Sequence, residues 1–88
     1  MNIIVDDELR GICSELLAEG WAEAEWAERE ADDWIETERY VGGFDADEGA
    51  FTFSRYTDGD EVWFQFTLTE AAAIADGTLT QLEARLAQ

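Results

Sequence analysis

Carboxylates are the residues of this chain that could do chemistry, and they gather in one region. Thirteen of the 22 Asp and Glu residues lie between positions 6 and 38. A carboxylate can act as a general acid or base, bind a metal ion, or attract a basic surface. Six acids and one tryptophan of this region form the candidate partner-binding set: Glu23, Glu25, Trp26, Glu28, Asp32, Asp33 and Glu36.

Catalysis is poorly supported, so we expect a protein that is not an enzyme. Acid–base catalysis needs two carboxylates in different environments, and the hydrophobic pattern marks no pair as buried. Cys13, Ser14 and Ser54 lack a histidine base, because the chain contains no histidine. Cys13 falls on an apolar stripe, where a small buried residue is expected.

We also expect no cofactor and no metal. Zinc sites need histidine or several cysteines, and the chain has no His and one Cys. The segment 45–49 (DADEG) resembles a calcium loop, but its glycine comes one position early and Tyr56 stands where the final glutamate belongs. We interpret the segment as a solvated turn. Phosphate binding lacks a Gly-rich loop and a lysine.

Composition limits the class of protein. A chain of 88 residues is expected to form one domain, 1–88, and a hydrophobic content of 47% is enough for a packed core. The net charge of -17 repels nucleic acid and anionic lipid but attracts basic proteins. A single cysteine, no membrane-length apolar run and no basic N-terminal region predict a soluble, cytoplasmic protein.

The acidic region is predicted to be one long helix from Asp6 to Glu38, with Asp6 or Asp7 as its N-cap. Placed at 100° steps, its apolar residues, Trp34 among them, keep one phase from Leu9 to Ile35. A break at Gly20, with a second helix starting at Trp21, is the alternative. On the continuous helix, four carboxylates at spacings of three and four form one ridge: Glu25, Glu28, Asp32 and Glu36.

A β section and a helical end follow, which gives an α+β fold. Strands are predicted over 37–44, 50–56 and 61–68, with a hairpin turn at Asp58-Gly59. In this register Phe51 and Phe53 share an apolar face expected to pack on the long helix, while Trp63 and Tyr56 lie on the mixed face. One or two short helices are predicted at the C-terminal end, the first over 70–75 with Thr69 or Thr67 as its cap and the second from Thr78 onward.

Aromatic residues among carboxylates suit docking to a basic surface, because arginine stacks on rings and pairs with acids. Trp26 falls away from the centre of the apolar stripe, among acidic residues. It can serve such docking, or it can cover a second small core or a helix edge. An exposed tryptophan is equally compatible with a monomer or a homodimer.

Size, charge and the helix Trp21 to Glu38 resemble small phage-encoded DNA mimics of the anti-CRISPR and anti-restriction type. Duplex DNA carries one charge per ~1.7 Å, and a carboxylate-studded helix offers a comparable field. The resemblance implies a non-enzymatic inhibitor that binds a basic nucleic-acid-binding partner, such as a CRISPR-Cas effector subunit, and binds neither nucleic acid nor membrane. Two alternatives remain: acidity as an adaptation to high salt, and an antitoxin-like protein-interaction module.

Overall fold

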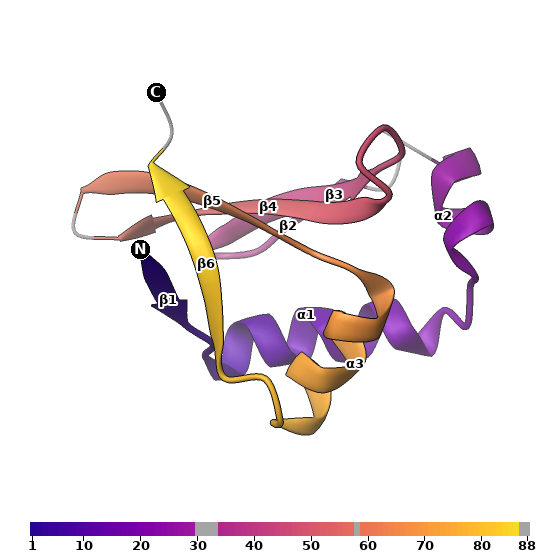
Figure 1. Cartoon of the computed structure of the whole chain (residues 1–88), viewed down its shortest axis with the longest axis horizontal. Helices are drawn as coiled ribbons and strands as arrows, with labels where there is room; N and C mark the ends of the chain where they lie inside the picture. The colour runs from indigo at the N-terminus through magenta and orange to yellow at the C-terminus, as the bar shows by residue number, and fades with distance from the viewer. Residues whose placement is uncertain (30–33, 58, 87–88) are drawn as a thin grey trace.

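The computed structural model describes residues 1–29, 34–57 and 59–86 (Figure 1). Its elements in chain order are β1 Asn2–Ile4, α1 Asp7–Ala18, α2 Glu23–Arg29, β2 Ile35–Glu36, β3 Tyr40–Asp45, β4 Ala50–Thr57, β5 Asp60–Phe66, α3 Leu68–Asp76 and β6 Gln81–Leu86. The strands form one antiparallel sheet in the order β1-β6-β5-β4-β3-β2. The α+β class is confirmed, but the three-stranded sheet is wrong, because the described residues contain six strands.

The long acidic helix is also wrong, and the break at Gly20 is confirmed. Asp6 caps α1 as predicted, its Oδ1 accepting from the backbone N of Leu9 at 2.9 Å. The helix ends at Ala18, and Gly20 follows at φ +71°, a conformation that costs glycine little. Beyond α2, Ile35 pairs with Gly42 in the sheet. The apolar residues that share one helical phase from Leu9 to Ile35 therefore belong to two helices and a strand, not to one helix.

The central hairpin is confirmed in its register. Phe53 pairs with Phe64, and Phe51 pairs with Phe66. Thr57 pairs with Asp60, and Asp58 of the predicted turn lies outside the described residues. Inward and outward side chains alternate, so this register alone decides which residues enter the core.

One face of the sheet carries the core, and α1 and α3 cover it (Figure 1). Phe51, Phe53, Phe64 and Phe66 are each at most 1% exposed and stack on one another at 5.5–6.4 Å between ring centroids. Gly42 lets β3 lie close to this layer, since a Cβ there would come within 2.2 Å of the Thr52 carbonyl oxygen.

Of the helices predicted for the C-terminal part, the first is confirmed and the second is not. Helix α3 has the expected cap at Thr67, reciprocated by Glu70, and it ends at Gly77 in the left-handed conformation. The helix predicted from Thr78 is wrong, because residues 81–86 form β6 between β1 and β5. Leu82 and Ala84 are buried at a spacing of two, the period of a strand. None of the described helices is long and apolar enough to cross a membrane.

Candidate protein-interaction face

The predicted partner-binding residues do not form one ridge. Glu23, Glu25 and Glu28 are exposed on α2, whereas Glu36 is exposed on β2. Asp32 and Asp33 lie outside the described residues. Because the helix ends at Arg29 and a strand begins at Ile35, the helical spacing that predicted a ridge from Glu25 to Glu36 does not apply.

Trp26 is buried, which overturns its role as an exposed docking residue. It is 3% exposed and lies edge-on to Phe51, with ring centroids 5.2 Å apart, and 4.7 Å from Trp21. Its Nε1 has no hydrogen-bond partner among the described residues. Trp26 therefore anchors α2 to the end of the sheet, which is the alternative that the sequence left open.

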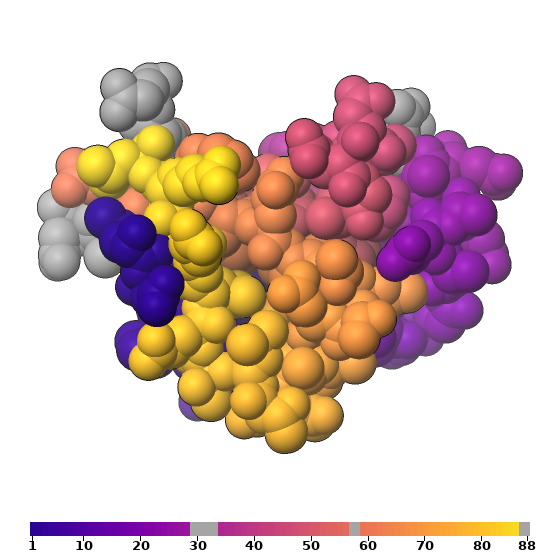
Figure 2. All heavy atoms as spheres, viewed as in Figure 1, coloured from indigo at the N-terminus to yellow at the C-terminus, as the bar shows by residue number. Residues whose placement is uncertain are grey.

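The other face of the sheet has no helix over it in the described part of the chain (Figure 1). We call it the open face. Sheet pairing places one row of its side chains side by side across five strands: Glu36, Val41, Ser54, Trp63 and Arg85. Figure 2 shows the outline of the molecule dipping between the β3–β4 turn and β6, above this face. The predicted positions of Trp63 and Tyr56 on the mixed face are thus confirmed.

Aromatic residues on the open face reach solvent. Trp34, just before β2, is 60% exposed, and Tyr56 on β4 is 68% exposed. Trp34 was expected on the apolar stripe of the long helix. Since β2 alternates by two, Trp34 shares the side of Glu36 rather than that of Ile35. Applying the two-residue period of a strand to this segment would have placed Trp34 on the open face.

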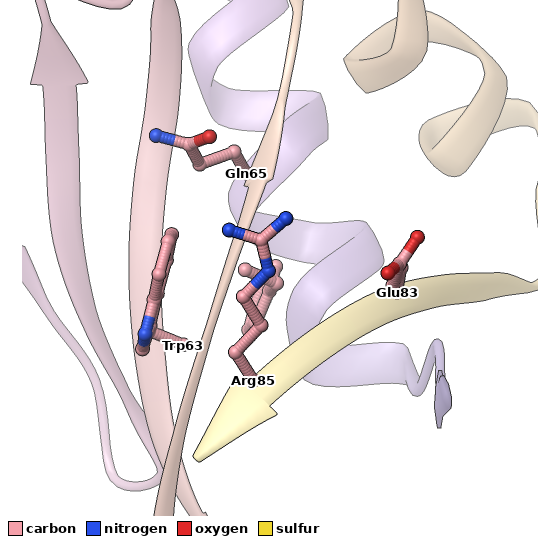
Figure 3. Close-up of a pocket in the computed structure, with 5 residues that line it drawn as sticks. Trp63, Gln65, Glu83 and Arg85 are labelled. Carbon is pink, nitrogen blue, oxygen red and sulfur yellow. The ribbon is translucent and has the colours of Figure 1, made fainter. Parts of the chain in front are cut away.

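Two shallow hollows flank Trp63. The first, of about 260 Å³, lies between Trp34 and Trp63. It is lined by Trp34, Val41, Thr52, Phe53, Ser54, Glu61 and Trp63. The second, of about 170 Å³, is lined by Trp63, Phe64, Gln65, Glu83 and Arg85. Figure 3 shows the Arg85 side chain beside the Trp63 ring, and the guanidinium carbon lies 5.4 Å from the ring centroid.

A buried polar group lies at one end of the helix-covered face, and the sequence did not predict it. Arg55, 8% exposed, donates from Nη1 to the Tyr40 hydroxyl at 2.7 Å. The same nitrogen lies 3.8 Å from Asp6 Oδ2, which also pairs with Arg39 at 2.7 Å. Burial raises the pKa of Tyr40 to about 12, against the opposing effect of Arg55. The phenol is therefore protonated at neutral pH, and this group ties the start of α1 to β3 and β4.

The remaining candidate groups have structural roles. Cys13 is buried, and burial raises the pKa of its thiol to about 12, so the predicted small core residue is confirmed. Asp45 accepts from the backbone N of Asp47 at 3.0 Å, which closes the predicted turn on itself. Within residues 1–29, 34–57 and 59–86, no group of three or more His, Cys, Asp or Glu residues is placed to hold a metal ion.

The open face is thus the surface of the described chain that combines solvent-exposed aromatic rings, shallow hollows and carboxylates. Its carboxylates include Glu36, Glu61 and Glu83, and the Arg85 guanidinium lies beside Trp63. Comparison with known proteins adds no relative: no protein-family model, no curated protein and no solved structure matches this chain.

Proposed function

We propose that this protein is a non-enzymatic binding protein that docks its open face on a basic surface of a partner protein. The partner surface we propose is one that otherwise holds nucleic acid, so that docking excludes DNA or RNA. This retains inhibition by nucleic-acid mimicry but moves the contact from a helical ridge to a sheet face. Such an inhibitor, directed at a complex such as a CRISPR-Cas effector, would act in the cytoplasm of a phage-infected bacterium.

The observation that carries the proposal is the exposure of Trp34 and Tyr56 among carboxylates on a face without helices. Folding gains little from an aromatic ring left mostly in water, whereas protein interfaces are enriched in Trp and Tyr. The surrounding carboxylates select a partner of opposite charge and speed its association. Acidic side chains alone would account for attraction to a basic partner. The exposed rings add a contact at a defined position on the face.

The second candidate role is adaptation to high salt, and one observation favours it. Exposed carboxylates occur on every described helix as well as on the sheet. They include Asp7, Glu15, Glu19, Glu23, Glu25, Glu28, Glu36, Glu70, Asp76 and Glu83. A surface used only for solvation is expected to be acidic in this even way. Adaptation to high salt does not explain an exposed tryptophan.

Charge reversal on two matched surfaces tests the proposal. One triple variant carries Glu36→Lys, Glu61→Lys and Glu83→Lys on the open face, and the other carries Glu23→Lys, Glu25→Lys and Glu28→Lys on α2. Both change the net charge equally. Partners are captured from nuclease-treated bacterial lysate at low salt, identified by mass spectrometry, and then challenged with duplex DNA and with rising salt.

We expect the wild type and the α2 variant to retain a nucleic-acid-binding partner that DNA displaces, and the open-face variant to lose it. Loss in the α2 variant alone would assign the contact to that helix instead. If neither triple changes the captured proteins, and the circular dichroism spectrum becomes native only near molar salt, the acidity serves solvation and the proposal fails.

A further inference from the structure

The hollow between Trp34 and Trp63 brings together side chains of different chemistry. Its lining includes two indole rings, one from the segment before β2 and one from β5. Thr52 and Ser54 of β4 contribute hydroxyl groups, and Val41 and Phe53 contribute apolar surface. The carboxylate of Glu61 also belongs to the lining. The lining is therefore mostly aromatic and apolar, with two hydroxyl groups and one negative charge.

We propose that this hollow receives an arginine side chain of the partner protein, an inference that rests on the proposed docking of the open face. A guanidinium is planar and weakly hydrated, so it can stack on an indole while its N–H groups reach a carboxylate or hydroxyl. A lysine ammonium is compact and strongly hydrated, which makes it a poorer fit to two rings. A phosphate or carboxylate group is repelled by Glu61 and by the net charge of -17.

The described part of the chain contains an example of this contact. Arg85 pairs with Trp63 across β5 and β6, and its guanidinium carbon lies 5.4 Å from the Trp63 ring centroid. Arg85 lines the second hollow, on the side of Gln65 and Glu83 (Figure 3). The lining of the first hollow, taken over the described residues, includes the same ring and a carboxylate but no basic side chain. Because this lining supplies a carboxylate but no basic group, charge complementarity favours a guanidinium from another molecule.

Two labelled peptides of equal length and charge provide the test, one with four arginines and one with four lysines in a Gly-Ser background. A third peptide, with citrulline in place of arginine, keeps the shape and removes the charge. Fluorescence anisotropy is measured at low salt and at physiological salt. We expect the wild type to bind the arginine peptide about fivefold to tenfold more tightly than the lysine peptide. The citrulline peptide is expected not to bind.

Trp34→Ala is the diagnostic variant, because Trp34 is 60% exposed and contributes little to the core. We expect it to bring the affinities for the two basic peptides together. Tyr56→Ala is the matched control. It removes an exposed ring from the same face that does not line the hollow, and it is expected to keep the arginine preference.

The outcomes separate this inference from the function it rests on. Equal, salt-sensitive affinity for both basic peptides, unchanged by Trp34→Ala, overturns the arginine site and leaves the docking of a basic partner standing. An arginine preference that survives Trp34→Ala but disappears in Tyr56→Ala also overturns it, because the ring involved is then elsewhere. Absence of binding to either basic peptide at low salt overturns both.

Discussion

On β4 and β5, side chains that face α1 and α3 are buried, whereas their sequence neighbours face away from any described helix. Phe53 is 1% exposed and Phe66 is 1% exposed, while Tyr56 on the opposite face is 68% exposed. The two faces share the same backbone and the same register. They differ only in which alternate residues point toward the helices.

This contrast separates residues that stabilise the fold from those of the proposed docking face within one sheet. The helix-covered face holds the stacked Phe layer and the buried Arg55, so its residues are constrained by packing. The open face holds Trp34, Trp63 and short polar side chains, which no described helix covers and which the proposed partner would contact. Substitutions on the first face are expected to change the free energy of unfolding. Those on the second face are expected to change binding alone.

The largest expected difference between the faces is at neighbouring positions of β4. Phe53→Ala removes a ring that stacks on Phe64 and Phe66, and it is expected to cost about 3–5 kcal/mol of unfolding free energy. Ser54→Ala, its neighbour on the open face, is expected to stay within about 0.5 kcal/mol of wild type. Urea unfolding followed by circular dichroism measures both. Equal effects would mean that the open face also contributes to the core.

Two tryptophans of the acidic region, Trp26 and Trp34, sharpen the same contrast. Trp26→Ala is expected to cost about 3 kcal/mol, because the ring is 3% exposed and packs on Phe51. Trp34→Ala is expected to leave stability within about 0.5 kcal/mol. The measurement is thermal and urea unfolding of each variant. A strongly destabilised Trp34→Ala would show that this ring is part of the fold.

Gly42 tests how closely β3 lies against the Phe layer. A Cβ at Gly42 would come within 2.6 Å of the Phe53 Cα, a backbone atom that cannot move aside cheaply, so Gly42→Ala is expected to cost about 1–3 kcal/mol. Gly11→Ala is the control, since nothing lies within 4 Å of its Cβ position on α1. It is expected to stabilise by about 1 kcal/mol. A neutral Gly42→Ala would contradict the close approach.

The smallest expected effect, measured just above pH 9, is a loss of stability from the covered face. Burial raises the pKa of Cys13 from 9.0 to about 12 and that of Tyr40 from 10.0 to about 12. Each raised pKa contributes stability that is fully present below the unfolded value and is lost as pH rises toward the folded value. Urea midpoints should therefore fall as pH rises above about 9.

Cys13→Ala is the control for this pH dependence. It removes the thiol while leaving Tyr40 in place, so the fall in the midpoint just above pH 9 is expected to become shallower. In the native wild type, the buried thiol is expected to react with a thiol reagent only on unfolding. Rapid labelling of the native protein at neutral pH would show that Cys13 is accessible.

The sequence predicted the positions of some aromatic residues of the open face but not of others. Alternation and the hairpin turn placed Trp63 and Tyr56 on the mixed face, because short-range strand pairing fixes register locally. Trp34 was missed, because its spacing also fits a helix in phase with Leu9. Trp26 was placed among the acids on that same helix. Only the break at Gly20 turns the Trp26 ring onto Phe51.

The sequence by itself determined the elements whose signals are local: the start of α1 near Asp6, the β4–β5 register, and α3 ending at Gly77. The structure selected Asp6 and Thr67 from the two caps that the sequence allowed for each helix. Tertiary structure alone decided the fate of residues 81–86, which consist of good helix formers yet form β6. Leu82 pairs with Ile3, and Ala84 with Phe64, from strands far apart in the chain. Those pairings complete the sheet, and burial against it outweighs a weak local preference for helix.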